Sequence, residues 1–98
     1  MNAYILVQLH FKDQVAYQRY RAAFPAVFGQ FKGRVLIADQ APVTLSGDGS
    51  WDKVVVLEFP DESEALRFYR SPEYRAISVD FQLAADATFT LLKGVLPH

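Results

Sequence analysis

His10 and Glu58 are the two side chains of this sequence whose types best suit proton transfer. His10 lies near the end of an alternating segment, Ala3 to Phe11, and Glu58 interrupts an apolar one, Val54 to Phe59. We expect the two segments to be neighbouring strands that run in parallel, with both side chains on the same face. A histidine and a carboxylate in a closed space can act as general acid and base. The alternative is a satisfied polar pair at an interface between subunits.

A second set of candidates could bind a ligand. Four tyrosines fall in segments with helical spacing, Arg19 and Arg21 could hold a carboxylate beside them, and Trp51 follows a glycine-rich turn and could close a cleft. The tyrosines are Tyr17, Tyr20, Tyr69 and Tyr74. Helical tyrosines also commonly pack in a core, the arginines could be solvated charges, and Trp51 could cover a partner subunit. The residue types leave these alternatives open.

The sequence has no motif for a metal ion, a cofactor or a phosphate group. His10 and Glu58 are too few for a metal site, and the chain has no cysteine that could act as a thiolate ligand or nucleophile. The glycine patterns of phosphate-binding loops and dinucleotide-binding folds are also missing, as is a nucleophile elbow. We therefore expect neither a metal nor a cofactor.

The segment from Val54 to Tyr74 predicts the elements around which the chain is organised. Four consecutive apolar residues from Val54 indicate a buried strand, which Pro60 ends because proline lacks an N–H donor. Asp61 is followed three residues later by a glutamate, which is the spacing of a capping box at the start of a helix. Ser71 and Pro72 combine a cap with proline at the first helical position, and so predict a second helix.

Hydrophobic periodicity predicts the remaining elements. Strands are expected over Ala3–Phe11, Arg34–Asp39 and Thr88–Lys93, and a helix over Gln14–Phe28. Pro25 should kink this helix or start its last turns afresh. The second strand should be interrupted at Ala41-Pro42, as a bulge or an edge position, and resume over Val43–Leu45.

The order β-α-β-β-α-β, with the second helix broken in two, predicts an α+β fold. Two interlocked βαβ crossovers give a four-stranded antiparallel sheet with the helices on one face. The other face should retain Tyr4, Leu6, Val54, Val56 and Leu92. Such a patch is larger than a soluble monomer usually exposes, so we expect a homodimer that pairs these sheet faces.

Composition sets further limits. The 98 residues predict one domain, residues 1–98, and a hydrophobic content of 51% with eight phenylalanines is consistent with surface covered by another subunit. The net charge is −1 without a basic stripe, so nucleic acid and anionic membranes are not expected partners. Neither a targeting signal nor a membrane-spanning run is apparent, which predicts a cytoplasmic protein.

Several of these residues together resemble a known family. They include Leu57-Glu58-Phe59-Pro60, Ser71-Pro72-Glu73-Tyr74, Ala84-Ala85 and Gly94. The sequence is similar to the domain-of-unknown-function family 1330, whose members resemble the dimeric α/β-barrel, ferredoxin-like proteins. The resemblance implies a ferredoxin-like fold and a homodimer.

The resemblance leaves two classes of function. Similar dimeric barrels include cofactor-free enzymes of the monooxygenase or isomerase type, which implies activity on a small hydrophobic or aromatic ligand. The alternative is a non-catalytic dimer that binds a small ligand or is associated with stress. Whether the protein is an enzyme is left open, because a shared fold does not imply a shared function.

Overall fold

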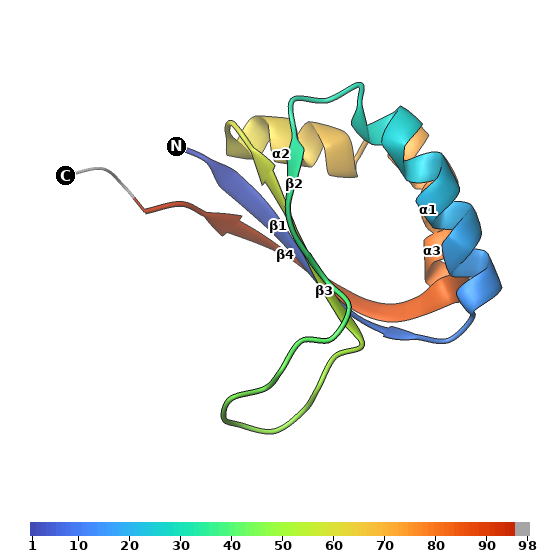
Figure 1. Cartoon of the computed structure of the whole chain (residues 1–98). Coiled ribbons are helices and arrows are strands. Elements are labelled where there is room, and N and C mark those ends of the chain that lie inside the picture. Colours follow the sequence, from blue (N-terminus) through green and yellow to red (C-terminus); the bar gives the residue numbers. More distant parts are fainter. Residues whose placement is uncertain (96–98) are drawn as a thin grey trace.

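The computed structural model describes residues 1–95 and has the expected order of elements (Figure 1). Strands β1 (Ala3–Phe11), β2 (Arg34–Asp39), β3 (Lys53–Phe59) and β4 (Ala85–Lys93) form one antiparallel sheet in the order β2-β3-β1-β4. The helices are α1 (Gln14–Phe28), α2 (Glu62–Tyr69) and α3 (Pro72–Ala84). This is the ferredoxin-like arrangement that the sequence predicted.

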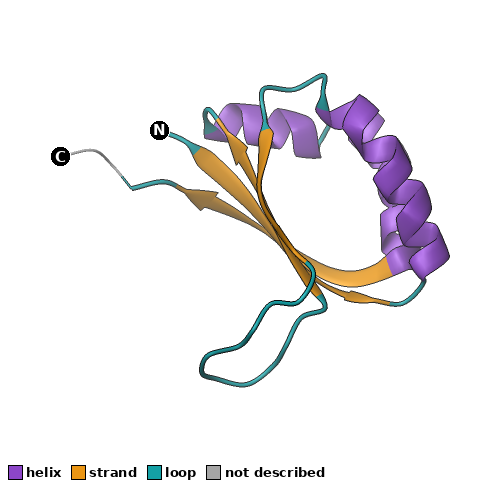
Figure 2. Cartoon of the chain, viewed as in Figure 1, coloured by secondary structure: helices purple, strands orange, loops and turns teal. Residues whose placement is uncertain are grey.

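The three helices lie on the concave side of the curved sheet (Figure 2). Alternate residues of β1 face them, and Ile5, Val7 and Leu9 are at most 5% exposed. The ring of Phe68 on α2 fills the space above the sheet, with ring centroids 5.6 Å from Phe59 and 4.6 Å from Tyr74. The core therefore consists of alternate side chains of β1 and of the aromatic rings beneath α2.

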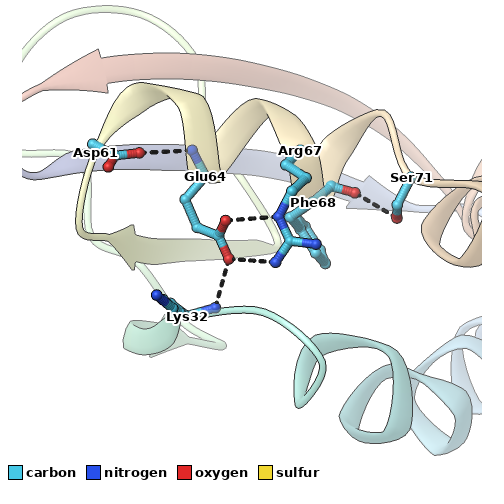
Figure 3. Close-up of polar contacts among 6 residues, drawn as sticks. All are labelled: Lys32, Asp61, Glu64, Arg67, Phe68 and Ser71. Carbon is cyan, nitrogen blue, oxygen red and sulfur yellow. Dashed lines mark hydrogen bonds and ion pairs between the residues drawn. The ribbon is translucent and has the colours of Figure 1, made fainter.

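Side-chain caps fix both ends of α2 (Figure 3). The carboxylate of Asp61 accepts a hydrogen bond from the amide of Glu64, as predicted for a helix start. The Glu64 carboxylate in turn accepts hydrogen bonds from the guanidinium of Arg67 and the backbone amide of Lys32. The hydrogen bonds from Arg67, which have the larger effect, and from Lys32 lower the pKa of Glu64 to about 2. Glu64 thereby ties α2 to the segment that precedes β2.

Ser71 connects α2 to α3 by two hydrogen bonds. Its hydroxyl donates to the carbonyl of Phe68 at 2.8 Å and accepts from the amide of Tyr74 at 3.1 Å. The side chain thus closes the end of one helix and caps the start of the next, in which Pro72 takes the first position. The predicted break of the second crossover into two helices is confirmed.

Helix α1 runs through Pro25 to Phe28 as one helix, so of the two predicted alternatives the fresh start of its last turns does not occur. Two other predicted details differ. Strand β2 does not resume over Val43–Leu45, because β3 begins only at Lys53 and offers no ladder partner there; these residues lie in an exposed loop. The irregularity of β2 falls instead between Val35 and Ile37. Finally, β4 begins at Ala85, directly after α3, rather than at Thr88.

No helix among residues 1–95 is both long and apolar enough to cross a membrane.

Candidate functional site

His10 and Glu58 do not meet. Strand β3 lies between β1 and β2 and is antiparallel to both, so the expectation of parallel neighbours was wrong. Glu58 lies opposite Tyr4, whereas His10 lies six residues further along β1, about 20 Å away along a strand. Both side chains are on the same face of the sheet, but at opposite ends. The predicted acid–base pair therefore does not form within one chain.

Glu58 is instead part of a polar cluster near the end of β3, beside the starts of β1 and β2. It forms an ion pair with Arg34 on β2 and accepts a hydrogen bond from the side-chain amide of Asn2 at 3.4 Å. The hydrogen bond from Arg34, helped by hydrogen bonds from Tyr4 and Asn2, lowers the pKa of Glu58. A carboxyl group that is kept ionised in this way is a poor general acid at neutral pH.

His10 packs at the other end of the sheet, outside the helix layer. Its ring stacks on Trp51 with centroids 4.8 Å apart and planes inclined by 25°. Its Nδ1 lies 3.8 Å from a carboxylate oxygen of Asp52, and both side chains are about half exposed. Trp51 therefore covers His10 and does not close a cleft between helices and sheet.

A cleft of about 290 Å³ lies between α1 and the helix-facing side of the sheet. Its walls are apolar and aromatic. The sheet contributes Val7, Leu9, Val55 and Leu57, and the helices contribute Phe24 and Phe81. Val35 and Ala38 of β2 complete the rim. This volume lies near the lower end of the ~300–1,000 Å³ range of small-molecule sites, so the cleft suits a small ligand.

Three of the predicted ligand-binding residues line this cleft, namely Tyr17, Tyr20 and Arg21 on α1. They are spaced at three and four positions, which places them on one side of the helix. The remaining candidates do not line it. Tyr69 packs beside Phe89, with ring centroids 5.5 Å apart, and beneath the guanidinium of Arg75.

Tyr74 reaches the cleft indirectly through Tyr20. The two hydroxyl oxygens are 2.9 Å apart in the interior, and either can be the donor. Burial, followed by the neighbouring Tyr74, raises the pKa of Tyr20, and burial raises the pKa of Tyr74 to about 12. Both phenols are therefore neutral at physiological pH and act as hydrogen-bonding groups, not as bases.

Lys53 is a residue of the cleft that sequence reasoning missed. It is the first residue of β3, it is only 6% exposed, and its Nζ lies 5.1 Å from the centroid of the Tyr17 ring. The alternation of Lys53, Val55 and Leu57 along the strand was the available signal, because residues two apart share a face. The unbroken apolar run that follows Lys53 obscures this alternation in the sequence.

Among residues 1–95, no cluster of three or more histidine, cysteine or acidic side chains could hold a metal ion. The cleft has cationic and phenolic groups instead, which can bind anions and hydrogen-bond acceptors.

Comparisons with known proteins agree with the fold. The sequence profile of a family described as "Domain of unknown function (DUF1330)" matches residues 2–95. No curated protein matches the chain. A solved structure of RPA0582, a protein of unknown function from Rhodopseudomonas palustris, is 25% identical with a TM-score of 0.81, over 98% of this chain and 84% of that one.

More distant structures share the fold alone. A dimeric protein of unknown function with a ferredoxin-like fold from Bacteroides fragilis is 11% identical, with a TM-score of 0.64 over 95% of this chain and 96% of that one. SnoaB, a cofactor-independent oxygenase from Streptomyces nogalater, is also 11% identical, with a TM-score of 0.59 over 98% of this chain and 93% of that one.

Proposed function

The chain belongs to the DUF1330 family, whose description assigns no activity, and we propose from its geometry that it binds a small hydrophobic or aromatic molecule in the cleft between α1 and the sheet. The observation that carries this proposal is the cleft itself. It combines apolar walls with a few polar groups, Tyr17, Tyr20, Arg21 and Lys53. Most small-molecule sites have this composition, because apolar walls provide affinity and the polar groups orient the ligand.

The uncharged tyrosine side chains of the cleft suit hydrogen bonding and ring contacts with a ligand. Tyr20 lines the cleft while its hydroxyl is shared with Tyr74. Its raised pKa keeps the proton in place. The rings of Tyr17 and Tyr20, 6.1 Å apart, are part of the cleft lining, which suits contact with an aromatic ligand.

A second candidate function is catalysis on the bound molecule without a cofactor. Support comes from the likeness in fold to SnoaB, which is described as a cofactor-independent oxygenase. Fold-level analogy is a weak argument for chemistry, and the separation of His10 from Glu58 removes the acid–base pair that the sequence suggested. Ligand binding therefore takes precedence.

We further propose that the protein is a homodimer that pairs the sheet faces opposite the helices. The protein of unknown function from Bacteroides fragilis that shares this fold is dimeric. In this chain, Ile37 on β2 is 48% exposed and Leu92 on β4 is 42% exposed. The loop between β2 and β3, which extends away from the helices in Figure 1, carries Val43 and Leu45 at 79% and 94% exposure. A second copy would cover this apolar surface.

A fragment-binding experiment tests the cleft. Small aromatic and aliphatic compounds would be titrated into isotope-labelled protein, and amide shifts would be followed by NMR. We expect the shifts to cluster on α1 and on β3 from Lys53 to Leu57. The variant Ala38→Phe should fill the rim and abolish these shifts, whereas Ala22→Phe, at an exposed position of α1, should leave them unchanged. Shifts that cluster elsewhere would refute this site.

A further inference from the structure

Among residues 1–95, Lys53 is the one charged residue that is buried. It lies opposite Leu9 of β1, on the helix-facing side of the sheet. Lysine is almost never fully buried unless its ammonium is paired, because removing a charge from water is costly. The ammonium of Lys53 therefore needs a partner that accepts its hydrogen bonds or carries a negative charge.

The described part of the chain does not provide an acidic partner. All ion pairs among these residues involve other side chains. The Nζ atom of Lys53 lies over the ring of Tyr17, 5.1 Å from the ring centroid. A ring face attracts a cation, but an ammonium has three N–H donors that need acceptors.

Lys53 lines the cleft. No side-chain nitrogen or oxygen in residues 1–95 is both fully inaccessible and without a hydrogen-bond partner. Nζ makes no hydrogen bond to a side chain or backbone group of the described residues, so it keeps some accessible surface, and Lys53 is part of the cleft lining.

The charged side chains that line the cleft are both cationic, Lys53 and Arg21. Arg21 lines it one helical turn after Tyr17, on the same side of α1. No aspartate or glutamate contributes to the described lining. This contrasts with the chain as a whole, whose net charge is −1. The positive charge is therefore a local property of this site.

We infer that the ligand of the cleft is a small hydrophobic or aromatic carboxylic acid, whose carboxylate pairs with Lys53. The inference rests on the proposed function of the cleft and specifies its ligand class. The carboxylate supplies the acceptors that Lys53 lacks, and the apolar body packs between Tyr17, Phe24 and Phe81. Arg21, which is more exposed, is positioned to add a second cation near the opening.

Two matched probes test the charge. Phenylacetate and phenylacetamide have nearly the same size, but only the first is an anion, and both would be titrated by NMR or calorimetry. We expect the carboxylate to bind about tenfold or more tightly than the amide, since charge-assisted hydrogen bonds are stronger than neutral ones. In Lys53→Met this preference should disappear while amide binding remains. Lys93→Met, an exposed strand lysine, is the matched control and should keep the preference.

The outcomes separate the two proposals. Equal binding of both probes to the unmodified protein would overturn the carboxylate inference and leave the binding function intact. Binding of neither probe at millimolar concentration would overturn both. Displacement of phenylacetate by equimolar inorganic phosphate would identify a phosphate site and overturn the ligand class. The comparison on the unmodified protein decides the matter even if Lys53→Met fails to fold.

Discussion

The hydroxyl groups of Tyr20 on α1 and Tyr74 on α3 are 2.9 Å apart in the interior and form a hydrogen bond between the two helices. The rings meet edge to face, with centroids 6.3 Å apart. Tyr20 is also part of the cleft wall, so this contact holds one side of the candidate site against the second crossover.

Removing one hydroxyl of this pair should destabilise the fold. We expect Tyr20→Phe or Tyr74→Phe alone to lower the free energy of unfolding by about 1–2 kcal/mol, because the remaining buried hydroxyl loses its partner. The double variant should lose less than the sum of the two single changes. Urea unfolding measures all three. Tyr69→Phe, whose hydroxyl makes no side-chain hydrogen bond in the described chain, is the control, and strict additivity would contradict the coupling.

Ser71→Ala should cost about 1 kcal/mol of stability, since it removes the cap of α3. The same change also removes the donor to the carbonyl of Phe68. The midpoint of thermal or urea unfolding measures the effect. Ser63→Ala, an exposed position within α2, should change the midpoint little. Equal midpoints for Ser71→Ala and the unmodified protein would show that the cap contributes nothing.

Glu64 should make stability depend on pH in the acid range. Its pKa is about 2 in the folded protein, below the ordinary value of 4.5. The unfolded chain therefore binds more protons between these values, so the contribution is fully present above about pH 4.5 and is lost as the pH falls toward about 2. Glu64→Gln should cost about 1 kcal/mol at pH 7.

The matched control for this pH dependence is Glu62→Gln, since Glu62 is an exposed residue in the first turn of the same helix. Unfolding midpoints measured from pH 2 to pH 7 should converge for Glu64→Gln and the unmodified protein at the acid end. A constant difference across that range would contradict the assigned pKa.

The proposed dimer predicts the mass in solution. Light scattering at micromolar concentration should give about twice the chain mass of 11.1 kDa. Val56 lies on the sheet face opposite the helices, between Leu6 and Ile37 on the neighbouring strands. Val56→Asp should therefore yield monomeric, aggregated or unfolded protein, because it places a charge in the interface.

Val79→Asp changes an exposed valine of α3 and should keep the dimer. A well-folded monomer from the unmodified sequence would refute the proposed pairing of sheet faces.

The sequence by itself determined the local elements and their order. Asp61 and Ser71 cap helices at the predicted residues, and α1 and β1 have the predicted bounds. Each of these features depends on side chains within a few positions of one another, or on a hydrophobic period along one segment. Such information is present in the linear chain.

Only the tertiary structure decided which distant side chains meet. The antiparallel register of β1 and β3 separates His10 from Glu58. The position of α1 over the sheet brings the Tyr17 ring to within 5.1 Å of Lys53 Nζ and leaves the cleft between helix and sheet. Such contacts depend on strand direction, register and the seating of a helix on a sheet. Local periodicity leaves these undetermined, because the same pattern of apolar residues fits either strand direction.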